Sequence, residues 1–307
     1  MFEAILLSLA GLAGLAIGGE LLVRGAVGIA QKLGVSTLFT GLVIVGFATS
    51  MPEMVASVQA ALAGSPQIAW GNVVGSNLAN TLLILGVSAL VMPIALTGSG
   101  RRDAVVALGL TLMLWGLALS QLGARWIGFA FLGGIIVYIV WRYRNPGDAP
   151  VDGGGGTEKV RAVVAGGLFV VGLGILVLGG QALVTGAIAL ATLLNVPETV
   201  IGLTVVAVGT SLPELAASIA AALRGKSGLA LGNVVGSNIY NILLIGGATM
   251  SLAPAAIPAS LAGLQMALLA VSAVALLALL WAAKRIGRIV GALLVTAFIA
   301  NVVLVFA

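Results

Sequence analysis

The sequence predicts an all-α polytopic membrane protein with ten transmembrane helices, arranged as two five-helix repeats of inverted topology. Three observations predict this fold. Of the 307 residues, 61% are hydrophobic and only 7% are charged, whereas about 25% are charged in ordinary soluble domains. The apolar stretches are long enough to cross about 30 Å of hydrocarbon, which takes about 20 residues. The second half of the chain also repeats motifs of the first half. Together these observations exclude a water-soluble globular fold.

Charged, Gly, Pro and Asn residues divide the chain into ten apolar segments. No basic region precedes the first segment, so we interpret it as a membrane span and not as a cleaved signal peptide. The first and sixth segments exceed a simple span, and we expect them to be tilted or to extend past the bilayer. The segments are 4–31, 37–62, 69–94, 104–120, 126–141, 162–192, 199–223, 230–252, 259–282 and 288–306.

The predicted domains follow from this division. Residues 1–144 form the first repeat and residues 161–307 the second. Residues 145–160 form a linker rich in Gly and Pro, which we expect to be flexible and cytoplasmic.

The basic residues predict the orientation in the membrane. If the N-terminus lies outside and the spans alternate, only Arg125 falls in an outer loop, and Arg24 lies within the first helix. Cytoplasmic loops carry an excess of Lys and Arg, so both termini are predicted on the extracytoplasmic side of the cell (inner) membrane. The net charge of +5 thus reports orientation in the lipid bilayer and no nucleic-acid partner, and no obligatory protein partner is evident. The residues predicted on the cytoplasmic side are Lys32, Arg101, Arg102, Arg142, Arg144, Lys159, Arg161, Arg224, Lys226, Lys284, Arg285 and Arg288.

The internal repeat is the most informative feature of the chain. Residues 41–86 align without gaps on residues 202–247, and 26 of the 46 positions are identical. The shared blocks are TSxPE and GNVVGSNxxN, which low-complexity apolar sequence does not produce by chance. Each unit holds five spans, an odd number, so the second copy is predicted to cross the membrane upside down. Inverted repeats place a substrate site near the midplane and favour alternating access, although channels also use them.

Three carboxylates lie within predicted spans, where each costs about 2.5–3.5 kcal/mol on insertion scales. Glu20 is four residues from Arg24, and we interpret the two as a local ion pair. Glu53 and Glu214 are equivalent in the two repeats and have no basic residue within two turns. These two glutamates are therefore the predicted centre of the functional site.

The residues around the two glutamates offer oxygen atoms that can bind a cation. Pro52 and Pro213 each remove a backbone hydrogen bond and free carbonyls upstream. Carboxylate, amide, hydroxyl and carbonyl oxygens suit hard cations such as Ca²⁺ and Na⁺. The two carboxylates match the charge of one divalent ion, or bind several monovalent ions together with the neutral oxygens. Asn72 and Asn233 lie near the site and either add oxygens to it or only cap or bridge helices, and the glycines of GNVVG are interpreted as close packing points. The predicted metal ligands are Glu53, Glu214, Thr49, Ser50, Thr210, Ser211, Ser76, Ser237, Asn80, Asn241, and the carbonyls near Gly46 and Ala207.

Several functional classes lack their residues. The chain contains neither Cys nor His, which excludes disulfide scaffolds, thiol nucleophiles, His-based triads and the usual zinc, copper and iron sites. GNVVGSN is not followed by the Lys of a phosphate-binding loop. We therefore expect no enzyme and no cofactor.

The two motif blocks resemble the cation/Ca²⁺ exchanger superfamily, and in particular its prokaryotic Na⁺/Ca²⁺ exchanger branch. The blocks read ATSMPE at 48–53 and GNVVGSNLAN at 71–80, then GTSLPE at 209–214 and GNVVGSNIYN at 232–241. The resemblance implies antiport of cytosolic Ca²⁺ against Na⁺, with Glu53 and Glu214 as central ligands. It also implies that the TS pairs, the serines and the asparagines listed above complete the ion sites, while the long first and sixth helices slide to switch access.

The sequence departs from the family pattern at two positions. Ala48 replaces the usual Gly of the first block, and Asn241 stands where many relatives have Asp. The loss of that carboxylate argues against K⁺ co-transport. Because a glutamate pair can titrate, H⁺/Ca²⁺ antiport by the same fold stays open as an alternative, and a cation channel is a more distant one. A glutamate pair could also do acid–base work in an intramembrane enzyme, but no nucleophile or metal triad accompanies it.

Overall fold

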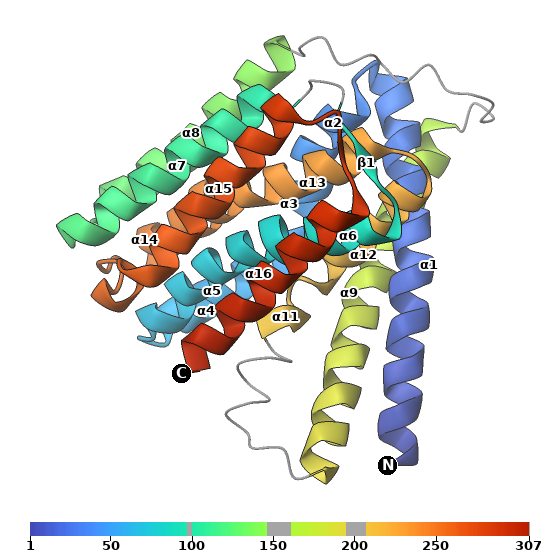
Figure 1. The fold of residues 1–307 in the computed structure, drawn as a ribbon, viewed down its shortest axis with the longest axis horizontal. Helices are drawn as coiled ribbons and strands as arrows, with labels where there is room; N and C mark the ends of the chain where they lie inside the picture. Colours follow the sequence, from blue (N-terminus) through green and yellow to red (C-terminus); the bar gives the residue numbers. More distant parts are fainter. Residues whose placement is uncertain (97–99, 146–160, 195–206, 307) are drawn as a thin grey trace.

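The computed structural model describes residues 1–96, 100–145, 161–194 and 207–306, and these residues are almost entirely helical (Figure 1). Seven described helices are long and apolar enough to cross a membrane, or eight if one bent pair is counted as a single span. The prediction of an all-helical membrane protein is therefore confirmed. The linker at 146–160 and the first part of the segment 199–223 lie outside the described residues.

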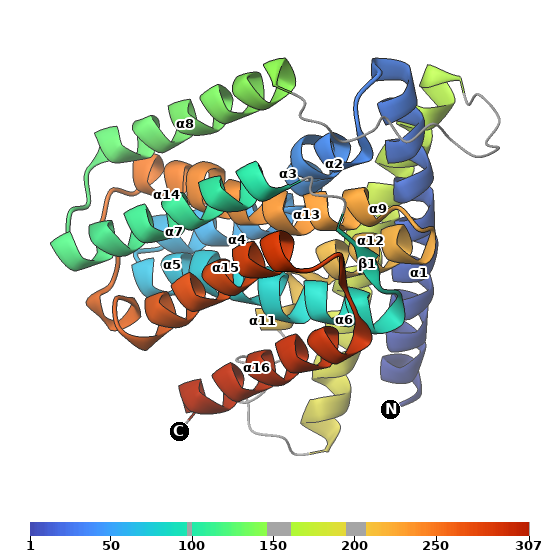
Figure 2. The same cartoon turned by 45° about the horizontal axis from the view of Figure 1, so that its top comes forward.

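Two helices of 32 residues each, α1 (Phe2–Leu33) and α9 (Ala162–Leu193), lie side by side along one edge of the molecule (Figures 1 and 2). Glycines bring their backbones together. A Cβ built on Gly11 would lie 2.5 Å from the backbone N of Leu183, and one on Gly172 would lie 2.4 Å from that of Leu22. Gly172 and Leu183 are the repeat equivalents of Gly11 and Leu22, so the two helices make reciprocal antiparallel contacts.

The first motif helix is interrupted, as the sequence predicts. It consists of α2 (Thr37–Phe39), the π-helix η1 (Thr40–Val45), α3 (Gly46–Thr49) and α4 (Met51–Leu62). The two halves are bent by 43° at Ser50, because Pro52 has no N–H to continue the α-helical ladder. In the second repeat, α11 (Ala207–Gly209) and α12 (Leu212–Leu223) are separated at Ser211, just before Pro213.

The second motif helices contain a π-helical turn at equivalent places. α5 (Pro66–Leu78), η2 (Ala79–Ile84) and α6 (Leu85–Val91) correspond to α13 (Ser227–Tyr240), η4 (Asn241–Ile245) and α14 (Gly246–Leu252). The prediction that the helix extends to residue 94 was wrong. It ends at Val91, because Met92 takes the extended conformation that a following proline, Pro93, favours.

The remaining helices cover the outside of the bundle. α7 (Arg101–Ser120) and α8 (Arg125–Arg144) pack mainly on α15 (Leu264–Ala282) and α14, and α16 (Arg288–Phe306) packs on α6. The ninth segment is predicted to begin at residue 259. In the structure, a 3₁₀ turn, η5 (Ala259–Leu261), comes first, and the α-helix α15 begins only at Leu264. Two short strands that the sequence did not predict, β1 (Ile94–Ala95) and β2 (Arg285–Ile286), pair antiparallel.

Ion pairs account for several of the charges near the helices. The predicted pair between Glu20 and Arg24 is present, and Arg224 at the end of α12 also binds the Glu20 carboxylate. Asp103 and Arg142 form a second pair that the sequence analysis did not foresee. It is buried between α7 and α8, with Arg142 Nε 3.0 Å from Asp103 Oδ1. Glu53 and Glu214 have no such cationic partner among the described residues.

Candidate functional site

Glu53 and Glu214 lie in the first turns of α4 and α12, directly after the two helix breaks. Their side chains are 1% and 2% exposed, so both carboxyls are removed from solvent. Ser211 Oγ donates to Glu53 Oε1 at 3.1 Å. The Glu214 carboxyl lies against the hydroxyls of Thr49 and Ser50, and it interacts electrostatically with Glu53. Each glutamate therefore lies beside hydroxyls of the other repeat, Glu53 beside Ser211 and Glu214 beside Thr49 and Ser50.

One asparagine in each repeat connects the two motif helices of that repeat. Asn72 Nδ2 donates to the backbone oxygen of Glu53 (3.2 Å) and to Ser57 Oγ (2.8 Å). Asn233 Nδ2 makes the same two bonds, to the backbone oxygen of Glu214 (3.2 Å) and to Ser218 Oγ (2.9 Å). These bonds agree with the interpretation of both asparagines as helix bridges.

The orientation of these amides leaves their oxygens available. Since both bonds use Nδ2, the amide oxygen points elsewhere. Asn233 Oδ1 lies 3.3 Å from Thr49 Oγ1 of the first repeat, and Asn72 Oδ1 accepts from Ser76 Oγ at 3.4 Å. The bridges therefore also add oxygen atoms beside the residues predicted as ligands.

The other predicted ligands lie on the helices that surround the two glutamates. Ser76, Ser237, Asn80 and Asn241 are all buried. Asn80 follows the first residue of η2, which packs against α12, and Asn241 is the first residue of η4, which packs against α4. The π-helical turn that contains each asparagine thus packs against the helix that carries the glutamate of the other repeat.

The backbone positions are described less fully. Gly46 starts α3, and a Cβ added to it would lie 3.1 Å from the backbone N of Ser237. Thr210 is half-buried at the second break. Ala207 starts α11, and its side chain lies outside the described residues. That the carbonyls of Gly46 and Ala207 bind an ion stays a prediction.

Close packing by the motif glycines occurs on one side of the site. A Cβ on Gly232 would lie 2.4 Å from the backbone O of Leu38, and one on Gly236 would lie 2.5 Å from that of Leu42. These contacts hold α13 against α2 and η1. For Gly71 and Gly75, no described atom lies within 4 Å of the added Cβ, so the packing interpretation is supported for the second repeat only.

Many buried oxygens of this region have no hydrogen-bond partner among the residues that the structure describes. Buried polar atoms are ordinarily satisfied, and an unpaired one costs about 1–3 kcal/mol. Here every unpartnered atom is an oxygen, and two belong to carboxylates. No cluster of three or more acidic, His or Cys residues occurs among the described residues. Carboxylate and neutral oxygens in this mixture suit Ca²⁺ and Na⁺ chemically. The atoms are Ser50 Oγ, Glu53 Oε2, Asn77 Oδ1, Asn80 Oδ1, Thr210 Oγ1, Glu214 Oε2, Ser237 Oγ, Asn238 Oδ1 and Asn241 Oδ1.

Comparison with known proteins identifies the family. The family model described as "Sodium/calcium exchanger protein" matches residues 3–144 and 164–307. The chain belongs to this sodium/calcium exchanger family. A candidate antiporter, CaxA of Alkalimonas amylolytica, is 36% identical over 100% of this exchanger chain and 99% of its own. The sodium/calcium exchanger MaX1 of Methanosarcina acetivorans is 34% identical over 78% of this chain and 80% of its own.

A solved structure supports the same assignment of this exchanger. The sodium-calcium exchanger NCX_Mj, soaked with zero Na⁺ and Ca²⁺, superposes with a TM-score of 0.86 at 32% identity, covering 98% of both chains. The resemblance that the two motif blocks predict is therefore confirmed, and this chain is a member of the prokaryotic branch of the superfamily.

Sequence reasoning missed Ser57 and Ser218, which orient Asn72 and Asn233. A usable signal was present, because each serine follows its glutamate by one helical turn in both repeats. It also did not foresee that each asparagine would contact the glutamate's own backbone oxygen.

Proposed function

We propose that this exchanger is a secondary active antiporter that exchanges Ca²⁺ for Na⁺ by alternating access and extrudes Ca²⁺ with the energy of the Na⁺ gradient. One observation carries this proposal. Two buried glutamates, one from each repeat, have no cationic partner among the described residues, interact electrostatically with each other, and each lie beside hydroxyl groups of the opposite repeat. The family and the NCX_Mj likeness support cation/Ca²⁺ antiport.

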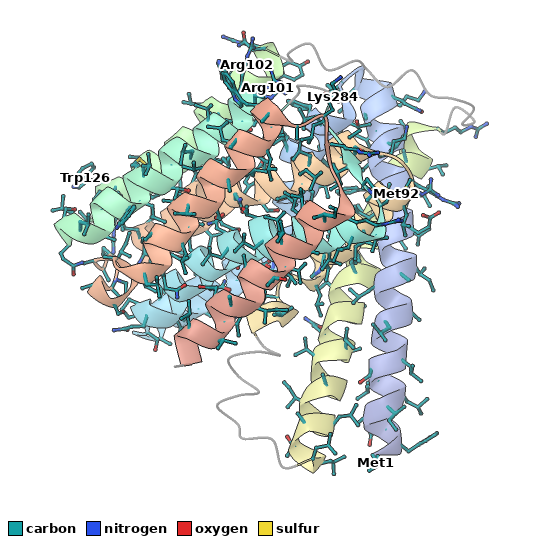
Figure 3. The ribbon with its side chains drawn as sticks, viewed as in Figure 1. Met1, Met92, Arg101, Arg102, Trp126 and Lys284 are labelled. Carbon is teal, nitrogen blue, oxygen red and sulfur yellow. The ribbon has the colours of Figure 1, made fainter. Side chains whose placement is uncertain are left out.

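The proposed architecture is ten spans in two inverted repeats, 1–144 and 161–307, inserted in the cell membrane with both termini outside. The reciprocal antiparallel contacts of Gly11 and Gly172 support the inverted relation. Both chain ends lie in the lower part of Figure 1, and Arg101, Arg102 and Lys284 lie toward the top of the same view in Figure 3. This separation supports a cytoplasmic face at the basic end.

In the proposed site, Glu53 and Glu214 supply two negative charges, which match one Ca²⁺. Thr49, Ser50, Thr210, Ser211, Ser76, Ser237, Asn80, Asn241 and the carbonyls near Gly46 and Ala207 supply neutral oxygens for Ca²⁺ or for Na⁺. Because both ions would use the same two carboxylates, binding of one opposes binding of the other. This mutual exclusion is what couples an exchange. If each cycle moves one net charge, the membrane potential contributes about 2.3 kcal/mol per 100 mV.

Purified protein in sealed vesicles tests the proposal by gradient swap. We expect ⁴⁵Ca²⁺ uptake when Na⁺ is loaded inside and absent outside, and none with a K⁺ gradient of the same size. Glu53→Gln and Glu214→Gln should abolish the uptake. Glu3→Gln, which changes an exposed glutamate of α1, is the matched control and should keep it.

Two other results would contradict the proposal. Uptake that ignores Na⁺ and follows a pH gradient would identify an H⁺/Ca²⁺ antiporter. Ca²⁺ currents that need no counter-ion and exceed carrier rates would identify a channel.

A further inference from the structure

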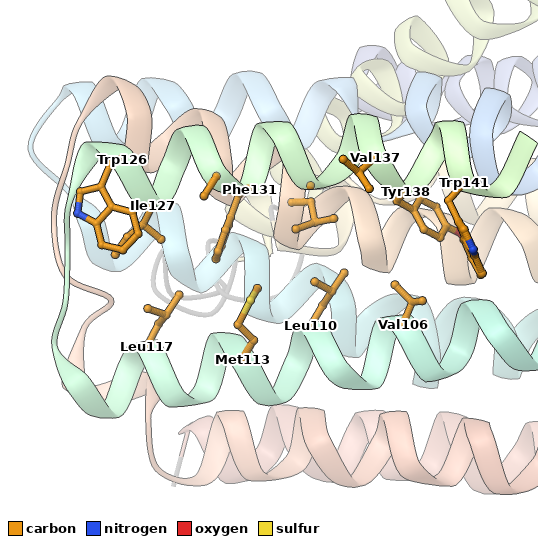
Figure 4. A pocket seen from close by; sticks show the side chains of 13 residues that line it. Val106, Leu110, Met113, Leu117, Trp126, Ile127, Phe131, Val137, Tyr138 and Trp141 are labelled. Atoms are coloured by element: carbon orange, nitrogen blue, oxygen red, sulfur yellow. The ribbon is translucent and has the colours of Figure 1, made fainter.

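A groove of about 550 Å³ lies on the outside of the bundle, between α7 and α8 (Figure 4). These helices are consecutive, but each packs mainly on another neighbour, α7 on α15 and α8 on α14. Phe131 and Leu243 are 5% and 4% exposed and belong to its buried part, while Trp126 and Val137 at its rim are both 68% exposed. The groove is thus an apolar furrow on a surface that faces hydrocarbon in a membrane.

The groove is apolar along its whole length. Its lining on α8 runs from Trp126 to Trp141, about 22 Å at a rise of 1.5 Å per residue. One leaflet of hydrocarbon is about 15 Å thick, so a single acyl chain fits lengthwise. The hydroxyl of Tyr138, which also lines the groove, donates to Asp103 Oδ1 at 2.9 Å and is therefore already satisfied.

Two arginines continue the lining beyond one end of the groove. Arg102 precedes Val106 by one turn of α7, and Arg144 follows Trp141 by three residues of α8, so each continues a lining face. Both side chains are exposed and have no hydrogen-bond or ion-pair partner in the described part of the chain. Figure 3 shows Arg102 at the end of the α7–α8 pair opposite Trp126.

The charges of the described residues leave this end positive. Asp103 is fully buried and bound by Arg142, so it neutralises Arg142 and not the two exposed arginines. The other arginine at this end, Arg101, is held on α15, where Nε donates to Leu280 O and the guanidinium stacks on Trp281. Two exposed arginines, Arg102 and Arg144, therefore lie next to an apolar groove that is long enough for one acyl chain.

We propose that the α7–α8 groove binds one anionic phospholipid, with an acyl chain in the groove and the phosphate between Arg102 and Arg144. Anionic lipids are concentrated in the cytoplasmic leaflet, which is the predicted side of both arginines. A second copy of the chain fits less well, because a two-fold axis along the membrane normal would bring the same arginines to the same depth. The lipid would rest on Leu243, two residues after Asn241 of the ion site.

Native mass spectrometry of the detergent-solubilised protein tests this site, using phosphatidylglycerol and phosphatidylcholine as probes. We expect one retained phosphatidylglycerol, bound about 25-fold more tightly than phosphatidylcholine, from about fivefold per arginine. The double variant Arg102→Gln/Arg144→Gln should lose this preference, whereas Arg102→Lys/Arg144→Lys should keep most of it.

The groove itself is tested by Gly134→Leu, because Gly134 lines it and faces Leu243. This variant should lose the retained lipid. Gly133→Leu, at an exposed glycine with open space beside it, is the matched control and should keep the lipid. A single size-exclusion peak and unchanged circular dichroism confirm that the variants fold.

Three results would overturn the proposal. These are equal retention of both lipids by the wild type, unchanged retention in the arginine-to-glutamine variant, and unchanged retention in Gly134→Leu. A protein dimer that Gly134→Leu dissociates would show that a second copy covers the groove.

Discussion

Ser211 reaches across the repeats to Glu53, and this bond shows how a single hydroxyl can tie one half of the site to the other. Ser211→Ala removes the donor and also one proposed ion ligand. Hydrogen bonds to charged groups contribute about 1.5–3 kcal/mol, so we expect the Ca²⁺ concentration for half-maximal uptake to rise about 10- to 100-fold. Concentration-dependent ⁴⁵Ca²⁺ uptake measures this. Ser120→Ala, at an exposed serine far along α7, should leave it unchanged, and an equal shift in both variants would contradict the role of Ser211.

Asp103 is a buried acid whose role is structural. It accepts bonds from Tyr138 and pairs with Arg142, and both it and Arg142 are almost fully buried. Asp103→Ala leaves the guanidinium buried without its partner, which typically costs about 3–5 kcal/mol. We expect the melting temperature in detergent to fall by several degrees. The double variant Asp103→Leu/Arg142→Met should recover much of the loss, and an equal loss in both would contradict a paired charge.

At the residue scale, the sequence predicts the acids of the site better than their surroundings. Glu53 and Glu214 stand out because an unpaired charge in a membrane span is costly and both recur at one position of the repeat. The contact between Ser211 and Glu53 depends on how the two repeats meet, which no local pattern encodes. Asp103 and Arg142 escape notice for the same reason, since they are far apart in the chain.

At the element scale, Glu20 connects α1 to the end of α12 through Arg224, with Arg224 Nε 2.6 Å from Glu20 Oε2. The hydrogen bond that Arg224 donates to the Glu20 carboxylate raises the pKa of Arg224, so the guanidinium stays charged throughout the physiological pH range. The repeat equivalents of Glu20 and Arg224 are Gln181 and Ala63, so this ion pair between the two repeats has no counterpart at the equivalent positions. If α1 slides against α12 during transport, this pair has to break.

Arg224→Gln tests that movement. A partly exposed ion pair contributes about 0.2–1 kcal/mol, so its loss should speed the Na⁺-driven exchange by at most about fivefold without changing ion affinity. Initial rates of ⁴⁵Ca²⁺ uptake at saturating ion concentrations measure this. Arg24→Gln keeps the bond between helices and is the matched control. A rate change of the same size in the control would show that the charge itself matters, and not the link between α1 and α12.

Helix ends show why element boundaries are only partly predictable. The proline breaks at Ser50 and Ser211 follow directly from the missing N–H of Pro52 and Pro213. The π-helical turns that begin near Asn80 and Asn241 leave no comparable mark in the sequence, because they depend on tertiary packing. The same holds for the strand pair of Ile94 and Ile286.

At the scale of the whole molecule, the duplication carries most of the prediction. It implies that residues at an offset of 161 occupy equivalent places, and the reciprocal contacts of Gly11 and Gly172 follow that rule. The acidic residues point to the same pair of equivalent positions. Of the acids in the described part of the chain, Glu20 and Asp103 have arginine partners, which leaves Glu53 and Glu214 as its buried acids available to a cation. The duplication does not predict differences between the two repeats, such as the Glu20–Arg224 pair, which has no equivalent at Gln181 and Ala63.

The central claim is that Ca²⁺ and Na⁺ compete for one site built on Glu53 and Glu214. Equilibrium binding of ⁴⁵Ca²⁺ to the purified protein, at increasing Na⁺, tests it most directly. We predict that Na⁺ displaces Ca²⁺ completely, with K⁺ at equal ionic strength having little effect, and that Glu53→Gln/Glu214→Gln binds no Ca²⁺ while Glu3→Gln binds normally. Ca²⁺ binding that survives saturating Na⁺, or that persists in the double glutamine variant, would contradict the claim.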